Sequence, residues 1–334
     1  METLPRVLDT DSTLEYYRVL ERFIARLRDG HTNVSAPREL RTALYARPPL
    51  RTRRFEDAVI VIEVFDEDLL GDGVKPGVEL VAIDGVPVFE YAETHIRPSM
   101  CASTPQDLDA RTFEYFLLRG STSEPVTLLL RDEDGTHIER AVPRLTREQQ
   151  TALRDPRPAF AMTQLDNGIL HIELNSFGTN EAAEAFVSAF DTISAARAVV
   201  LDLRNNGGGN SGVGWRILRH LTDRAVPTGQ WHTLQYRPAH RAWGRPPQTR
   251  FGSGAASYEA EVAGRFDRPI AMLIGPRTYS AAEDMAASFD MMERGALIGE
   301  STGGSTGQPL SITLPGGGSA RICAKHDTYA DGTA

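Results

Sequence analysis

Ser280 is the residue whose type and position point most directly to chemistry. It follows an apolar run at 270–274 and precedes a helical pattern formed by Ala282, Met285, Ala286, Phe289 and Met292. A serine between a buried strand and a helix N-terminus has its hydroxyl exposed beside free N–H groups and a partial positive charge. These surroundings suit a nucleophile whose reaction creates an oxyanion. The alternative is that Ser280 only caps the helix, because Glu283 completes the spacing of a capping box.

A glycine-rich loop ends a second apolar run, the predicted strand 198–203. Glycines let backbone N–H groups approach a ligand closely. A phosphate-binding loop and a plain turn are the alternatives, but the segment fits neither GxGxxG nor a P-loop, since no Lys-Ser/Thr follows. We therefore expect an oxyanion-binding loop, in which Gly208 or its neighbour Gly207 supplies an N–H. Asp202 and Arg204 would hold its base.

His31 is a candidate catalytic base near the N-terminus. It directly follows Gly30, which is predicted to end a helix as a C′ glycine. That helix would begin with a capping box at Ser12 and Glu15. Its apolar stripe consists of Leu14, Tyr17, Leu20, Ile24 and Leu27. Taken alone, a histidine after a helix is more often a capping or surface group than a base.

The composition excludes several classes of function. With 334 residues, of which 41% are hydrophobic and 24% charged, the chain is ordinary for a soluble globular protein of two or three domains. A net charge of -9 and the lack of a basic run argue against nucleic-acid binding as the main role. No apolar stretch is long enough to span a bilayer, and 1–14 lacks the pattern of a signal peptide. Cys101 and Cys323 match no metal pattern and do not indicate a disulfide scaffold.

Three regions follow from the patterning. Residues 1–50 read as a small helical cap followed by a loop that runs into the arginine-rich patch 51–54. Residues 55–147 are β-rich, with strands predicted at 59–62, 80–83 and 126–130, a helix at 112–118, and hairpin signals at Asp84-Gly85 and Asp134-Gly135. The stretch 88–109 has the character of an insertion within this region.

Residues 158–334 alternate strands and helices, which predicts an α/β core with much parallel pairing. Strands are expected at 168–174, 198–203, 270–274 and 296–298, and helices at 180–193, 215–221 and after Ser280. The stretch 227–257, rich in Pro, Arg and Gly, is expected to be irregular. Segments 310–314 and 320–324 are expected to form a closing hairpin around three glycines.

Together these segments resemble peptidase family S41, the C-terminal processing and tricorn-core serine peptidases. The matching motifs, in order, are Asp29-Gly30-His31-Thr32, a PDZ-like block at 73–85, Asp202 to Gly209, Thr278 to Glu283 and Gly299 to Gly304. The resemblance implies a ClpP/crotonase-like α/β core with an N-terminal helical cap and an inserted PDZ-like domain. It also implies hydrolysis of peptide bonds by Ser280, with an oxyanion hole formed by the N–H of Ala281 and that of Gly208 or Gly207.

The family has two catalytic variants, which differ in the base. One is a Ser–Lys dyad whose lysine lies in the loop that here reads 303–307, and that loop has no lysine. The chain has only two lysines, Lys75 in the PDZ-like block and Lys325 in the expected last strand. The other variant takes a histidine from the N-terminal helical region, and His31 matches it. The resemblance therefore implies a Ser/His enzyme.

Two departures from the tricorn-like pattern bear on the site. That pattern places a glutamate just after the Asp-Gly that here is 331–332, beyond the last residue given. Two explanations are expected: the core is truncated at its C-terminus, or the protein has lost this supporting residue. Glu283 or Glu300 would be the substitutes. The pattern also has a serine directly before the histidine, where this chain has Gly30.

The resemblance also sets the expected partners and the alternatives. A peptide or an unfolded protein is the expected substrate, a homo-oligomer is compatible with the family, and no cofactor, metal, nucleic acid or membrane span is expected. The first alternative is a non-catalytic protein that binds a hydrophobic ligand or peptide, like the repeats of interphotoreceptor retinoid-binding protein. The second is a crotonase-like acyl-CoA enzyme, against which the PDZ-like block counts.

Overall fold

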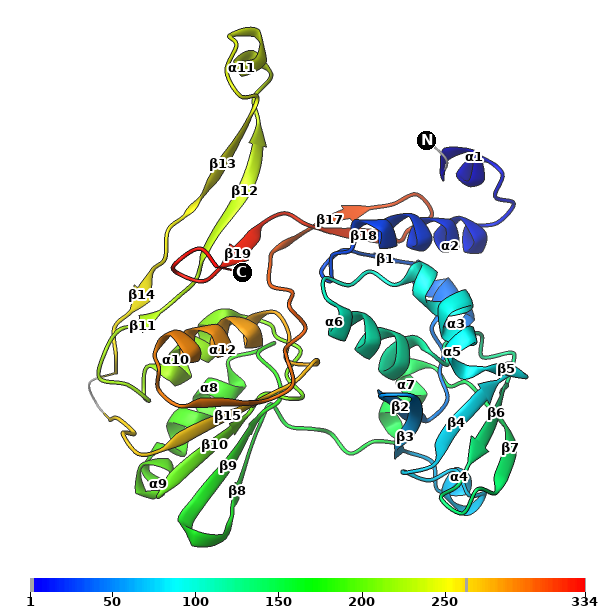
Figure 1. Ribbon diagram of the computed structural model, residues 1–334, viewed down its shortest axis with the longest axis horizontal. Coiled ribbons are helices and arrows are strands. Elements are labelled where there is room, and N and C mark those ends of the chain that lie inside the picture. Colours follow the sequence, from blue (N-terminus) through cyan, green and yellow to red (C-terminus); the bar gives the residue numbers. More distant parts are fainter. Residues whose placement is uncertain (1–2, 262–263, 334) are drawn as a thin grey trace. The chain divides into compact units, whose positions relative to one another are not determined.

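The computed structural model describes residues 3–261 and 264–333 (Figure 1). The chain divides into two compact units. Unit 1 consists of Met1–Pro156 and Ser311–Ile322, and unit 2 of Arg157–Leu310 and Cys323–Ala334. Within the described ranges, no helix is both long and apolar enough to cross a bilayer.

Unit 1 begins with two helices, α1 (Thr3–Leu8) and α2 (Thr13–Ile24). The predicted N-cap of α2 is confirmed, because the Ser12 hydroxyl accepts the Glu15 N–H at 3.2 Å. The predicted end at Gly30 is wrong. A tighter 3₁₀ turn, Ala25–Leu27, follows α2 and brings Arg28, with φ 50°, into the left-handed position two residues earlier.

Tyr17 joins this helical cap to the C-terminal part of unit 1. Its ring is fully buried, and its hydroxyl donates to the Pro315 carbonyl at 2.7 Å and accepts the Gly318 N–H at 2.8 Å. Those two residues belong to the turn between β17 (Pro309–Thr313) and β18 (Ser319–Cys323), the predicted hairpin. β18 also pairs antiparallel with β1 (Asn33–Ser35), so chain ends distant in sequence share one sheet.

The larger sheet of unit 1 has the order β2-β3-β4-β6-β7, all antiparallel, and β5 pairs with β4. Its strands are β2 (Leu50–Phe55), β3 (Ala58–Val64), β4 (Glu79–Ile83), β5 (Val86–Pro87), β6 (Val126–Arg131) and β7 (His137–Val142). The helices are α3 (Arg41–Leu44), α4 (Glu67–Gly71), α5 (Val88–Tyr91), α6 (Pro105–Asp109) and α7 (Arg147–Ala152), with a π-helical segment Ala110–Phe116.

The arginine-rich patch is a strand, which corrects the prediction of a loop. Leu50 and Thr52 of β2 are buried, and Arg51 and Arg53 alternate with them. These arginines form ion pairs with Glu63 at 3.2 Å and Glu114 at 3.0 Å, so their charge does not prevent strand pairing. The expected strands 59–62, 80–83 and 126–130 are all present.

Unit 2 contains a five-stranded sheet of order β16-β15-β10-β9-β8, in which only β8 runs antiparallel to its neighbour. Its strands are β8 (Phe160–Gln164), β9 (Ile169–Leu174), β10 (Ala198–Asp202), β15 (Ile270–Ile274) and β16 (Ala296–Gly299). The connecting helices are α8 (Glu181–Ser188), α9 (Phe190–Ala195), α10 (Ser211–Leu218) and α12 (Ala281–Met291). The predicted α/β alternation is therefore present, with the helix expected at 180–193 broken at Ala189.

These helices lie on one side of the sheet (Figure 1). The core between them is built from alternate strand residues, such as Ile172, Leu201 and Met272, and from Met285 and Phe289 of α12. All five side chains are fully buried, and each such burial contributes about 1.5–3 kcal/mol. This packing fixes the end of β15 against the start of α12, where Ser280 lies.

The stretch expected to be irregular is a long hairpin, which is a second correction. It consists of β12 (Gln230–Tyr236), a short helix α11 (Pro238–Ala242) at the tip, and β13 (Gln248–Ser253). β12 also pairs with β19 (His326–Thr328), and β11 (Val226–Pro227) pairs with β14 (Ser257–Tyr258) below the hairpin. No residue of β12 or β13 is buried, so the hairpin has no core-facing side and its sequence lacks the apolar alternation that predicts a strand.

Candidate active site

Ser280 occupies a strained turn between β15 and α12. Its φ of 55° and ψ of -123° lie outside the regions that residues with a side chain favour, at a cost of about 1–3 kcal/mol. Hydrogen bonds from the preceding residues hold this turn. The Tyr279 N–H donates to the Asn206 carbonyl at 3.0 Å, and the Thr278 hydroxyl donates to the Leu203 carbonyl at 2.9 Å. The turn is thus fixed to the loop that follows β10.

Glu283 joins the Ser280 turn to the loop after β16. Its carboxylate accepts the N–H groups of Ser280 at 2.9 Å, Gly304 at 2.6 Å and Ser305 at 3.0 Å, and the Thr302 hydroxyl at 2.7 Å. Burial raises the pKa of Glu283, and these four hydrogen bonds offset part of that rise. The carboxylate half of the predicted capping box is therefore formed, and it also fixes the loop that matches the family's Gly-Glu-Ser-Thr-Gly-Gly motif.

The glycine loop lies directly against Ser280. A Cβ on Gly208 would lie 2.6 Å from the Tyr279 carbonyl oxygen, 2.7 Å from the Ser280 Cβ and 3.0 Å from the Ala281 nitrogen. Its φ of 94° also belongs to the left-handed region that favours glycine. The structure therefore brings together Gly208, Ser280 and Ala281, three of the residues predicted for the site.

Asn206 holds the glycine loop in place and binds one of its donors. Its side-chain amide donates to the Leu174 carbonyl at 2.8 Å and accepts the Gly208 N–H at 2.9 Å. Asn206 is fully buried, whereas Gly207 is exposed. Of the donors predicted for an oxyanion hole, the Gly208 N–H is thus already directed at a side chain.

Asp202 ends β10, and its buried carboxylate forms an ion pair with the half-exposed side chain of Arg204. Its carboxylate accepts bonds from the Arg204 guanidinium at 2.7–3.2 Å and from the Arg204 N–H at 3.0 Å. It also contacts the His171 Nε2 at 3.0 Å. Burial raises the pKa of Asp202, but the hydrogen bonds from Arg204 and His171 outweigh it, and the net shift is downward. The predicted pair at the base of the loop is present.

His171 is a member of this cluster that the sequence did not indicate. It lies in β9, and its residue in the parallel register with β10 is Val200, two positions before Asp202. The alternation of polar His171 and Glu173 with buried Leu170, Ile172 and Leu174 was the available signal, because such alternation places both polar residues on the face opposite the core.

The lowered pKa of Asp202 predicts a pH-dependent contribution to stability. Because the folded-state pKa lies below the unfolded value, the ionised carboxylate stabilises the fold above about pH 4, and this contribution is lost as the pH falls through the folded pKa. Asp202→Asn should lower the free energy of unfolding by about 1–3 kcal/mol at pH 7. The difference from wild type should shrink at pH 3.

Urea unfolding of both proteins at the two pH values measures this difference. Asp191→Asn, an exposed aspartate of α9, is the matched control and should change little. An equal deficit at pH 7 and pH 3 in Asp202→Asn would contradict the electrostatic interpretation.

His31 belongs to unit 1, where it is buried in the turn between the 3₁₀ segment and β1. The preceding residue is held from both sides. The Gly30 N–H donates to the Ser103 hydroxyl at 2.9 Å, and the Gly30 carbonyl accepts from the Arg111 guanidinium at 2.8 Å. Arg111 also forms an ion pair with the buried carboxylate of Asp107 at 2.7 Å. The stretch 88–109, expected to be an insertion, thus contributes residues that position the candidate base.

The two lysines are both ion-paired. Lys75 contacts Asp132 at 2.9 Å in unit 1. Lys325 lies between β18 and β19, outside the strand predicted for it, and contacts Asp327 at 2.7 Å in unit 2. Burial raises the pKa of Asp284 in α12, the charge of Asp327 adds to the rise, and Lys325 counteracts it, so Lys325 lies within electrostatic range of this helix.

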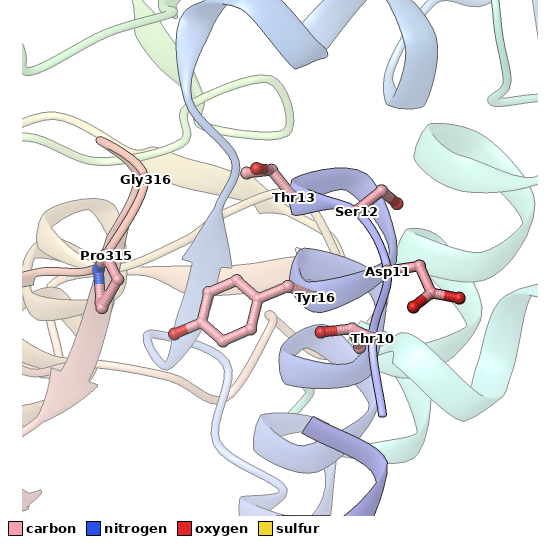
Figure 2. A pocket seen from close by; sticks show the side chains of 7 residues that line it. All are labelled: Thr10, Asp11, Ser12, Thr13, Tyr16, Pro315 and Gly316. Atoms are coloured by element: carbon pink, nitrogen blue, oxygen red, sulfur yellow. The ribbon is translucent and has the colours of Figure 1, made fainter. Parts of the chain in front are cut away.

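Glu300, the second expected substitute for the missing glutamate, is exposed directly after β16. An open pocket of about 310 Å³ in unit 1 lies between the start of α2 and the β17–β18 turn, and Tyr16 points across it toward Pro315 (Figure 2). That pocket contains none of the predicted site residues, since its lining is Thr10, Asp11, Ser12, Thr13, Tyr16, Pro315 and Gly316.

Comparison with known proteins decides the family. The model of peptidase family S41 matches residues 168–334, half of the chain, and includes the glycine loop and Ser280. The chain belongs to peptidase family S41. No curated protein sequence matches it. Family S41 consists of serine peptidases, so membership supports a serine peptidase function for this chain.

Solved structures share the fold of this S41 chain. Mature CPAF in complex with lactacystin matches with a TM-score of 0.73 and 14% identity, over 99% of this chain and 84% of that one. A putative peptidase from Parabacteroides merdae matches with a TM-score of 0.52 and 17% identity, over 99% and 77%. The photosystem II D1 C-terminal processing protease matches with a TM-score of 0.51 and 18% identity, over 98% and 81%.

Proposed function

We propose that this chain is a serine endopeptidase in which Ser280 is the nucleophile and His31 the general base. The observation that carries the proposal is the strained Ser280 turn packed against the glycine loop. A serine in an unfavourable φ/ψ region persists only where the surroundings fix it, and such strain is concentrated at functional sites. Family membership supports the peptidase function, and the sequence match at His31 supports the base.

The proposed reaction is acyl transfer. His31 removes the hydroxyl proton of Ser280 as its oxygen attacks the peptide carbonyl carbon. The tetrahedral intermediate collapses when the C–N bond breaks and His31 returns the proton to the leaving amine. Water, deprotonated by the same histidine, then attacks the acyl-enzyme and releases the acid and Ser280.

The oxyanion is stabilised in this proposal by backbone donors. The N–H of Ala281 begins α12, so the helix dipole adds to its hydrogen bond. The second donor comes from the glycine loop. Because the Gly208 N–H donates to Asn206, it would have to share its proton or leave that acceptor, whereas Gly207 is exposed to solvent. Each such donor contributes on the order of 3 kcal/mol.

The substrate is proposed to be an extended peptide or an unfolded protein. The antiparallel sheet of unit 1, with its turns at Asp84-Gly85 and at Gly135, fits the PDZ-like domain that the sequence resembles. Domains of that kind bind a peptide by adding it as a strand to a sheet edge. The core of unit 2 is proposed to be of the ClpP/crotonase type.

Intact mass after treatment with a fluorophosphonate tests the proposal. Wild type should gain one adduct, and Ser280→Ala should gain none, because an activated serine attacks phosphorus and an unactivated one does not. Ser288→Ala removes a buried serine hydroxyl in the same helix and serves as the matched control, which should label like wild type. An unlabelled wild type would contradict the peptidase proposal and favour a binding protein.

A further inference from the structure

The hairpin of β12, α11 and β13, here called the arm (230–253), differs in charge from the rest of the chain. It contains four arginines and no acidic residue, which gives a formal charge of +4. Because the whole chain carries -9, all other residues together carry -13. The four arginines are Arg237, Arg241, Arg245 and Arg250. A concentrated charge of the opposite sign is the pattern of an electrostatically guided contact.

The arm also exposes large apolar side chains. Leu234 is 62% exposed, Tyr236 58%, Trp243 66% and Phe251 55%. Single exposed apolar residues are common, but several on one element mark an interaction surface. Leu234 is paired across the hairpin with Arg250, so one face of the arm combines apolar and cationic groups. Aromatic residues and arginine are the types enriched at protein interfaces.

The arm is ordered by its own contacts. At its tip, the Arg237 N–H donates to the Pro247 carbonyl at 2.7 Å, and the Arg245 N–H donates to the His240 carbonyl at 2.8 Å. At its base, the Thr233 hydroxyl donates to the Ala324 carbonyl at 2.6 Å. In Figure 1 the hairpin extends from its pairing with β19 to a tip formed by α11. An arm that is already ordered loses little entropy when it binds.

Complementary chemistry is present in the same chain. Residues 55–147 contain 19 acidic and 8 basic residues, a net charge of -11. An apolar side chain is exposed beside acids in α4, where Leu70 is 43% exposed between Glu67 and Asp72. Contact between two arms would instead place +4 against +4.

We propose that the arm of one copy binds the acidic surface of residues 55–147 in a second copy. The exchange is reciprocal, so two identical contacts close a two-fold dimer. Arginines of the arm face the exposed carboxylates of Glu67, Asp68 and Asp72 at α4, and its aromatic residues cover Leu70. The contact is partly electrostatic, and added salt weakens it.

Sedimentation velocity over a range of protein concentrations tests the dimer. Wild type should dimerise, with a Kd that rises about tenfold when salt is raised from about 0.05 M to 0.5 M. Arg241→Glu/Arg245→Glu should raise the Kd about a hundredfold, because both side chains then repel the acidic surface. The matched control, Arg157→Glu/Arg197→Glu, makes the same change of charge at exposed arginines of unit 2 outside the arm and should dimerise like wild type.

A charge exchange identifies the binding surface. Glu67→Arg/Asp72→Arg should also prevent self-association, because a basic arm then meets a basic surface. Mixing it with the arm variant should restore a heterodimer, since each arm then finds a surface of opposite charge. Circular dichroism confirms that both variants are folded.

Each other outcome overturns a stated part of the proposal. A wild type that stays monomeric, including one that binds a polyanion through the arm, would overturn it. A dimer that the arm variant leaves intact would show that the arm is not the contact. Loss of the dimer without restoration in the mixture would show that 55–147 is not the acceptor surface.

Discussion

His31→Ala is expected to lower kcat for a peptide substrate by about 10²- to 10⁴-fold, the range that a general base contributes. The variant should keep its fold, because the Gly30 backbone before it remains bound to Ser103 and Arg111. His137→Ala, an exposed histidine of β7, is the matched control and should retain wild-type turnover. Cleavage of a fluorogenic peptide library, with thermal unfolding as the check on folding, measures the effect.

The same assay separates the two catalytic variants of the family. Lys325→Met should remain within about twofold of wild type, because Lys325 is bound to Asp327 in the proposed enzyme. Full activity of His31→Ala would remove His31 from the mechanism. If Lys325→Met were the inactive variant instead, the base would be the lysine.

Gly208→Ala is expected to lower kcat by about 10²- to 10³-fold, as the loss of oxyanion stabilisation does. The added methyl group would clash with the Tyr279 carbonyl at 2.6 Å and with the Ser280 Cβ at 2.7 Å. These atoms belong to a turn that is hydrogen-bonded to the glycine loop, so either the nucleophile or the loop must move. The free energy of unfolding should also fall by about 1–3 kcal/mol, because φ is 94°.

Gly275→Ala is the matched control, from the same turn between β15 and α12. Its Cβ would meet only the Arg204 side chain, at 4.0 Å, and its φ is not in the left-handed region. Peptide turnover and fluorophosphonate labelling should stay within about twofold of wild type. Normal labelling and turnover in Gly208→Ala would contradict the proposed contact between the loop and Ser280.

Local patterns were sufficient for the α/β core. The apolar runs at 198–203 and 270–274 and the stripe of α12 each bury one face, so their periodicity was readable from the chain. The arm and β2 were not predicted, because their sequences do not show such an apolar periodicity. Arg51 and Arg53 of β2 are satisfied by Glu63 and Glu114, a pairing that depends on residues distant in sequence.

The site was predictable in part. Ser280 and the glycine loop stood out because strand, turn and helix signals adjoin them, and the structure places Gly208 against Ser280. Ser103 and Arg111 carried no local signal, the role of Asn206 within its motif was not indicated, and His171 had only the polar alternation of β9 as a signal. Their parts in the site come from hydrogen bonds to residues brought near by sheet pairing and packing.

The sequence by itself determined the family, the α/β class of the core and the identity of the candidate nucleophile, because each rests on short motifs and local patterns, and on their order, which can be recognised without knowing which distant segments meet. Only the tertiary structure decided the conformation of Ser280 and the surroundings of Glu283. The serine turn is held in an unfavourable φ by bonds to the loop after β10, and the Glu283 carboxylate accepts four donors from two segments, the Ser280 turn and the loop after β16. Such bonds form only when folding brings those segments together, and this costs conformational entropy.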